Sequence, residues 1–217
     1  MSRSNFKSAL MLAASVCTAG ASAASYTDRT SFNAAAGSLT IESFESSPLV
    51  GNPGSGAVQS IAFADFSVSA SPAATKLADA DHFHGSFNTT PGGKKYLYLD
   101  TDVGFQGSTA TFSFNALTHA IGFDYTGVRE RGTTFDVTVD GTTFTLAPNV
   151  DDDSFGFWGY TSEAGFTSFT LATSLDSGYS LDQITYTAAI PEPQSYAMML
   201  LGLGCIGLLV RRRARPA

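Results

Sequence analysis

Short runs of alternating apolar and polar residues, separated by Gly, Pro, Asn and Asp, most constrain the fold of this 217-residue chain. Such runs are typical of half-buried β-strands, because successive side chains of a strand point to opposite faces. The clearest run is TFDVTVDGTTFTL, in which Phe135, Val137 and Val139 alternate with polar residues before an Asp-Gly pair. Asp-Gly supplies the positive φ angles of a two-residue turn, so we expect a β-hairpin over residues 134–146.

Residues 24–189 are predicted to form one all-β domain. Helical periodicity is nearly absent, and about ten short strands favour a jelly-roll-like β-sandwich, with a barrel as the alternative. The strands are expected at residues 39–44, 61–70, 96–99, 110–114, 120–125, 134–139, 142–146, 155–160, 166–172 and 179–187.

The apolar alternation shifts phase in two of these predicted strands, at Asp65 and at Asp182. Each shift predicts a β-bulge, which would turn its strand towards a second sheet. One short helix is also expected, with Thr30 or Ser31 as its N-cap and Gly37 at its end.

The N-terminal segment has the composition of a secretory signal peptide. Arg3 and Lys7 precede an apolar run, which ends in the small-x-small tripeptide Ala-Ser-Ala. We therefore predict a signal peptide over residues 1–23, cleaved after Ala23. The alternative is that this segment forms an N-terminal helix of the domain.

The charge and cysteine content of the domain exclude several classes of function. Between residues 24 and 190 there are 18 acidic and 6 basic side chains, a net charge of −12. A surface of this sign repels phosphate backbones and attracts divalent cations, so nucleic acid is not expected as a partner. Cys17 and Cys205 lie in the predicted signal peptide and in the C-terminal tail. The domain is therefore expected to use neither a disulfide nor a thiolate nucleophile.

No cofactor is certain from the sequence, and calcium (Ca2+) is the candidate. Glu42 or Glu45 could join Asp182 in a metal site, because the first and last strands of a jelly roll often lie side by side and Ca2+ prefers oxygen ligands. Two other metal candidates are the His-x-His pair at residues 82–84 and the three aspartates at residues 151–153. A solvated polar loop is the competing interpretation of both.

An aromatic run, FGFWGY, spans residues 155–160. In a strand its two phenylalanines point to one face, and Trp158 and Tyr160 point to the other. If the phenylalanines are core, Trp158 and Tyr160 are candidate glycan contacts, because an exposed flat ring can stack on a sugar. The competing interpretation is that Trp158 is buried between the two sheets.

The sequence lacks common catalytic motifs. It has no Gly-x-Ser-x-Gly elbow, no His-Glu-x-x-His and no Gly-rich phosphate loop. We therefore expect no catalytic residues and a protein that is not an enzyme. A secreted glycan-active enzyme is one alternative, because a pair of catalytic carboxylates has no fixed sequence spacing. A purely structural, calcium-stabilised module is the other alternative.

The chain closes with IPEPQSYAMMLLGLGCIGLLVRRRARPA, in which a Pro-Glu-Pro triplet, an apolar run and an arginine cluster follow one another. The apolar run over residues 196–210 is about 22 Å long as a helix, against roughly 30 Å for a bilayer core. Arginines that extend towards the membrane surface lengthen it, so we predict one short transmembrane helix. The arginines place its end in the cytoplasm and the domain outside.

The order of these three parts resembles the PEP-CTERM sorting signal of Gram-negative bacteria, over residues 190–215. The sorting residues would be Pro191, Glu192, Pro193, Arg211, Arg212 and Arg213. The resemblance implies transient recognition in the inner membrane by an exosortase, a membrane cysteine protease or transpeptidase. It further implies an inner-membrane-anchored precursor that reaches the cell surface or extracellular matrix. A link to exopolysaccharide and biofilm is implied as well, with polysaccharide as the partner of the domain.

Overall fold

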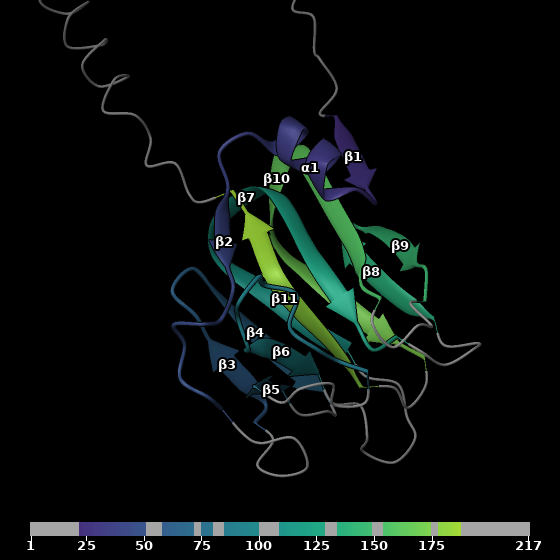
Figure 1. The fold of residues 1–217 in the computed structure, drawn as a ribbon. Coiled ribbons are helices and arrows are strands. Elements are labelled where there is room, and N and C mark those ends of the chain that lie inside the picture. Colours follow the sequence, from purple (N-terminus) through teal and green to yellow (C-terminus); the bar gives the residue numbers. More distant parts are fainter. Residues whose placement is uncertain are drawn as a thin grey trace, which may run out of the picture.

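The structure is a computed structural model that describes residues 22–50, 58–71, 75–79, 85–99, 109–128, 134–148, 154–174 and 178–187. Antiparallel strands dominate this part of the chain, and a helix lies against them (Figure 1). The elements are β1 (Ala23–Tyr26), α1 (Arg29–Ala36), β2 (Thr40–Glu42), β3 (Ser60–Ala62), β4 (Phe66–Ser71), β5 (Thr75–Ala78), β6 (Tyr96–Leu99), β7 (Thr109–Thr126), β8 (Phe135–Val139), β9 (Thr142–Leu146), β10 (Gly156–Thr173) and β11 (Tyr179–Tyr186).

Two strands of 18 residues, β7 and β10, run through both layers of the fold. The first half of β7 and the second half of β10 form one layer with β4, β8 and β9. The other halves form the second layer with β11, β6 and β1. The path of paired strands ends at β5 on one side and β9 on the other. The described strands therefore make an open β-sandwich, which confirms the predicted fold class.

Aromatic side chains fill the space between the two layers. Phe123 and Phe169 stack at a centroid distance of 5.9 Å with their rings tilted by 12°. Phe66 contacts Tyr186 edge to face at 5.7 Å, which joins β4 to β11 across the core. Burial of these rings supplies most of the hydrophobic driving force that a domain without a disulfide needs.

The hairpin predicted over residues 134–146 is present as β8 and β9. Val139 pairs with Thr142 across a two-residue turn. Asp140 and Gly141 both have positive φ angles, of 52° and 73°. The Asp-Gly signal therefore identifies the turn and fixes the register of both strands.

The bulge predicted at Asp65 is wrong. Residues 61–70 form two antiparallel strands, β3 and β4, instead of one strand. The reason is a tight turn, which the Phe63 N–H closes by donating to Phe66 O at 2.8 Å. A phase shift in the alternation marked the position correctly, but the chain reverses there instead of bending.

Four other predicted segments merge into two long strands. Residues 110–114 and 120–125 both belong to β7, and residues 155–160 and 166–172 both belong to β10. The polar residues between each pair form a corner where the strand crosses from one layer to the other, with shifts of register in β10. Two short strands, β1 and β5, were not predicted, because AASY and TKLA carry little apolar alternation.

The predicted helix is present as α1, but its N-cap is Asp28 instead of Thr30 or Ser31. Asp28 Oδ1 accepts hydrogen bonds from Ser31 N at 2.8 Å and from Ser31 Oγ at 2.9 Å. These bonds hold the pKa of the Asp28 carboxyl below its usual value. Gly37 ends the helix with a φ of 75°, as predicted.

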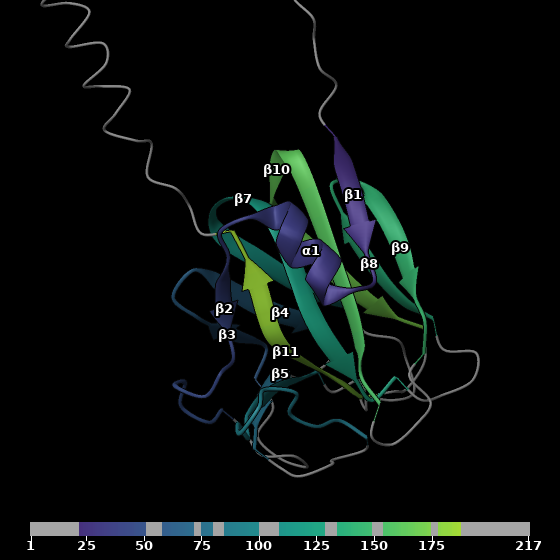
Figure 2. The same cartoon turned by 45° about the horizontal axis from the view of Figure 1, so that its top comes forward.

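A pair of glycines seats the helix on the sheet. Gly122 of β7 and Gly159 of β10 are cross-strand partners, and the Phe32 ring of α1 lies next to both. Figure 2 shows α1 in front of β7 and β10. A Cβ atom at Gly122 would lie 2.9 Å from the Phe32 ring, and one at Gly159 would lie 2.6 Å from it. Because larger residues would collide with this ring, the glycines allow α1 to cover this face.

Both predicted membrane-associated segments fall wholly or largely outside the described residues. The structure does not describe residues 1–21 of the predicted signal peptide, nor the predicted span at 196–210. Within the described ranges, no helix combines the length and the apolar character needed to cross a bilayer. Cleavage after Ala23 stays a prediction. It would remove the first residue of β1 and keep its pairs from Ala24 onwards.

Candidate functional site

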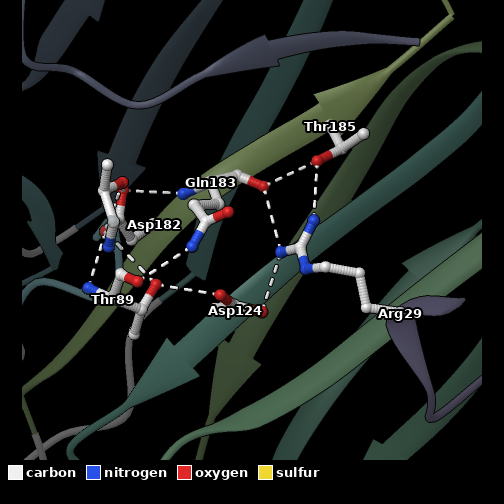
Figure 3. A network of polar contacts seen from close by, with 7 residues as sticks. Arg29, Thr89, Asp124, Asp182, Gln183 and Thr185 are labelled. Atoms are coloured by element: carbon white, nitrogen blue, oxygen red, sulfur yellow. Dashed lines mark hydrogen bonds and ion pairs between the residues drawn. The ribbon is translucent and has the colours of Figure 1, made fainter. Parts of the chain in front are cut away.

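A polar network lies between α1, β7 and β11 (Figure 3). Arg29 of α1 donates to Asp124 Oδ1 at 2.7 Å, to Thr185 Oγ1 at 2.9 Å and to Gln183 O at 3.3 Å. The side chain of Asp124 is only 2% exposed. A buried carboxylate needs a partner of opposite charge, and Arg29 supplies it.

Asp182 is the second carboxylate of the network and the cross-strand partner of Asp124. It accepts backbone N–H bonds from Thr89 at 2.7 Å, Thr90 at 2.9 Å and Gln183 at 2.7 Å. Burial raises the pKa of Asp182, although these bonds oppose the shift. The register shifts between Asp182 and Thr185, and Gln183 has a φ of 46°, so the bulge predicted at Asp182 is confirmed.

The Thr89 hydroxyl connects the two carboxylates. Its Oγ1 lies 2.9 Å from Asp124 Oδ2 and 3.2 Å from Asp182 Oδ2, so four oxygen atoms of the pair all have partners. Neither carboxylate is among the lining residues of three hollows found between described residues, near Asp65, Phe155 and Glu163. A catalytic pair must reach a substrate. This pair instead ties the loop at residues 85–95 to the sheet.

The three carboxylates predicted as calcium ligands all accept hydrogen bonds. Glu45 Oε1 accepts from Asn88 Nδ2 and from the backbone N–H groups of Lys94 and Lys95, and Glu42 Oε1 accepts from Phe44 N at 2.6 Å. Asp182 accepts the donors described above. Among the described residues, no three acidic, His or Cys side chains form a group that could hold a metal. Glu45 and Asp182 hold neighbouring residues of the loop at residues 85–95, and calcium binding by them stays a prediction.

The His-x-His pair and the three aspartates lie in segments that the structure does not describe.

The predicted glycan contacts, Trp158 and Tyr160, are core residues. Their side chains are 2% and 3% exposed, and the two rings stack at 6.2 Å. The competing interpretation, that Trp158 is buried between the sheets, is thereby confirmed. An exposed pair of rings for stacking on a sugar is not available at these two positions. The strand alternation was correct, but the tryptophan face is the one that packs inward.

The aromatic ring that the run FGFWGY exposes is that of Phe155, at 55%. It borders a hollow of about 450 Å³ between the edge of β1 and β9. We call this the aromatic hollow, and its lining residues are Ser25, Thr27, Tyr125, Phe144, Thr145, Leu146, Ala147, Phe155, Gly156, Phe157 and Trp158. None of them carries a charge. Figure 2 shows β1 and β9 on the same side of β10.

The chemistry of the aromatic hollow combines flat rings with hydroxyl groups. Phe155 and Phe157 offer ring surface, and Ser25 and Thr27 offer hydroxyls that can donate and accept. The Thr145 hydroxyl donates to Asp136 and can still accept. This combination matches a sugar ring, which has an apolar C–H face and a rim of hydroxyls. The strand of this feature was predicted correctly, but which of its two faces is core was left open, because alternation does not decide it.

The predicted sorting residues, from Pro191 to Arg213, lie outside the described residues, so their placement rests on the sequence. Residues 189–213 match the family model of the PEP-CTERM protein-sorting motif. No curated protein sequence matches the chain.

Three solved structures are similar to this chain at low TM-scores. A mutant of the carbohydrate-binding module CBM29-2 has a TM-score of 0.38 at 6% identity and covers 72% of this chain and 99% of its own. TmCBM61 in complex with β-1,4-galactotriose has a TM-score of 0.33 at 14% identity, over 57% of this chain and 88% of its own. The enzymatically active domain of tailspike protein 4 from bacteriophage CBA120 has a TM-score of 0.34 at 11% identity, over 57% of this chain and 19% of its own.

At these TM-scores the three likenesses carry no argument about a ligand or an activity. The family model does carry one, because it matches the segment in which the triplet, apolar run and arginines were identified. The chain therefore carries the PEP-CTERM protein-sorting motif, which indicates an exported, exosortase-sorted protein of the cell surface or extracellular space.

Proposed function

We propose that this protein is an exported matrix protein of a Gram-negative bacterium, whose non-catalytic β-sandwich holds polysaccharide in the aromatic hollow. The precursor is anchored in the inner membrane by residues 196–210 until an exosortase acts at Pro191-Glu192-Pro193. The observation that carries the proposal is the sorting motif at residues 189–213. The motif supports a role at the cell surface or in the extracellular space, and the aromatic hollow is the feature of the described domain that fits a ligand found there.

The aromatic hollow supports a neutral polysaccharide over an anionic one. Its lining has no charged side chain. The domain around it carries a net charge of −12, which repels a chain of uronic acids. Stacking on Phe155 and hydrogen bonds to the hydroxyls of Ser25 and Thr145 would give orientation and modest affinity per sugar. Many weak contacts along a polymer would then hold the protein by avidity.

The absence of catalysis is supported by the state of the buried carboxylates. Among the described residues, Asp124 and Asp182 form a close carboxylate pair of the kind that a glycan-active enzyme uses. Both are buried and bound to internal donors, and neither lines the aromatic hollow. These two carboxylates stabilise the fold, whereas the aromatic hollow is the proposed binding site.

Sorting is tested by expressing the chain with and without residues 190–217 in a host that contains an exosortase. We expect the full chain to give a membrane-bound precursor and a smaller surface or secreted product. The truncated chain should be released without passing through the membrane-bound form. Equal size and location of the products from both chains would contradict the proposal.

Binding is tested by native gels that contain a neutral polysaccharide, such as a glucan or galactan, or anionic alginate. We expect a neutral polysaccharide to retard the mature protein, and Phe155→Ala to weaken this about fivefold, which corresponds to one stacking contact of about 1 kcal/mol. Ile41→Ala is the matched control, because Ile41 is an equally exposed apolar residue, at 57%, outside the hollow.

Two outcomes would count against the binding half of the proposal. One is equal retardation of the wild type and Phe155→Ala. The other is release of new reducing ends from the polysaccharide, since that would make the domain an enzyme.

A further inference from the structure

Both ends of the described domain lie at one end of the sandwich. Near the N-terminus, Ala24 of β1 pairs with Thr161 of β10 and stays in the chain after the predicted cleavage. At the other end of the chain, Thr187 N–H donates to Ala120 O at 3.2 Å, and Thr187 Oγ1 accepts from His119 N at 2.8 Å. Ala24 and Thr187 line the same hollow, of about 380 Å³. Figure 1 shows the start of β1 and the end of β11 at the same end.

The distance from this end to the sorting triplet is limited by chain length. Thr187 is fixed to β7 by the bonds just described, and Pro191 follows four residues later. Four residues span at most about 14 Å when fully extended. An enzyme that grips Pro191-Glu192-Pro193 therefore has to work within roughly this distance of the folded domain, which is less than the thickness of a small domain.

We propose that this end of the sandwich, the exit face, is the surface that docks against the membrane-embedded sorting enzyme. The exit face comprises Ala24, Ala35, Leu117, His119, Glu163 and Thr187. The inference rests on the sorting half of the proposed function. The length of chain between Thr187 and Pro191 is the observation behind the inference. Four residues are too few to keep the folded domain apart from an enzyme that holds Pro191, so the two proteins come into contact.

Leu117 marks the exit face as a contact surface. It lies two residues before His119 in the corner of β7, and it is 50% exposed although it is a large apolar side chain. Ala35 of α1 is also exposed there. A small apolar surface next to the exit of the chain can pack against an enzyme surface without cost in polar desolvation.

Leu49 offers a matched position at the other end of the sandwich. It is 45% exposed, and its neighbour Val50 bridges to Leu77 of β5. Leu77 pairs with Leu97, and Leu97 pairs with Leu181, six residues before Thr187 on β11. Six residues of a strand span about 20 Å, so Leu49 lies far from the exit face.

The test measures conversion of precursor to mature product by pulse-chase in a host that contains the sorting enzyme. We expect Leu117→Glu, and independently Ala35→Glu, to slow conversion about fivefold or more, because a buried charge is placed in the interface. Leu49→Glu should leave the rate unchanged. Insertion of about ten Gly and Ser residues after residue 188 adds roughly 18 Å of average reach and should restore the rate of Leu117→Glu. Melting temperatures of the mature variants check that each one is folded.

Several outcomes would overturn the inference. Wild-type rates for both exit-face variants, equal slowing by Leu49→Glu, or failure of the insertion to rescue Leu117→Glu would each do so. Changed extraction of the Leu117→Glu precursor by salt, in a host that lacks the enzyme, would assign the contact to lipid instead. If the wild-type chain is not processed in an enzyme-dependent way, the proposed function fails, which is a different result from a processed chain that ignores the exit face.

Discussion

The polar network and the aromatic hollow are adjacent regions that use their side chains in opposite ways. Asp124 of the network is the cross-strand partner of Phe157, which lines the hollow. In the network, both carboxylates are buried and bound to donors from α1, the loop at residues 85–95 and β11. In the hollow, Phe155 is more than half exposed, and the lining hydroxyls are at the surface.

The comparison indicates that the network stabilises the fold and that the hollow binds a ligand. Charged residues are the usual candidates for a binding site, but polar groups that already form hydrogen bonds inside the protein are not available to a ligand. An aromatic ring exposed beside surface hydroxyls has area that a ligand can cover, which is what a binding site needs. We therefore expect changes in the network to alter stability and changes in the hollow to alter binding.

The largest expected effect is that of Arg29→Met. It leaves Asp124 as a buried charge without its cation, and we expect it to lower the free energy of unfolding by about 3 to 5 kcal/mol. Urea unfolding of the mature protein measures this loss. Lys94→Met is the control, because the Lys94 side chain is exposed, and it should change stability by less than about 0.5 kcal/mol.

The double variant Arg29→Met/Asp124→Asn sharpens this prediction. Replacing the unpaired carboxylate by a neutral amide should recover part of the lost stability. No recovery would mean that Arg29 acts through packing and not through the charge of Asp124.

The next effect in size is that of Asp182→Asn. Asp182 receives three backbone N–H groups on its two oxygens, and the amide of Asn would present N–H to at least one of them. An unsatisfied buried N–H costs about 1 to 3 kcal/mol, which urea unfolding detects. Asp136→Asn is the control, because Asp136 accepts the Thr145 hydroxyl at the surface. Loss of polysaccharide retention by folded Asp182→Asn would contradict the separation of the two regions.

A smaller effect tests the place where the two regions meet. The Arg29 guanidinium lies 4.6 Å from the centre of the Phe157 ring, so one residue of the network supports one residue of the hollow. A double-mutant cycle of Arg29→Met and Phe157→Leu should give a coupling of about 0.5 to 1 kcal/mol from this cation–π contact. Additive effects would show that the contact contributes nothing to stability.

The sequence predicted the fold well where local chemistry decides the structure. The Asp-Gly turn of the β8–β9 hairpin and the bulge at Asp182 both follow from short patterns. Their conformations depend on positive φ angles and on alternation, which can be read from a few residues. The family resemblance of the tail was likewise found in consecutive residues and is confirmed over residues 189–213.

The candidate site was less predictable, because it depends on contacts between distant segments. Nothing near Glu45 in the sequence indicates that Asn88 and Lys95 would donate to its carboxylate, so these contacts could not be predicted. Alternation placed Phe155 and Trp158 on opposite faces, but which face is covered depends on β9 and β1, which pack there only in the folded chain. Burial of Asp124 by Arg29, 95 residues away, leaves no local signal.

The smallest expected effect is in the pH dependence of stability, and it has an unusual sign. Burial raises the folded-state pKa of Asp182 above its ordinary value of 3.8. A proton then binds the folded state more tightly than the unfolded one. The contribution of Asp182 to stability is therefore fully present below pH 3.8 and is lost as the pH rises through the raised value. A carboxylate whose pKa is lowered, such as Asp28, does the opposite.

Asp182→Asn isolates this effect, because the variant keeps every other titrating group. We expect the stability of the wild type, relative to Asp182→Asn, to fall as the pH rises from about 3 to 7, as measured by urea unfolding at each pH. A difference that rises with pH would mean that the three N–H bonds outweigh burial and lower the pKa. Asp182 would then be a carboxylate held ionised by its loop, and the network would lose stability in acid instead of gaining it.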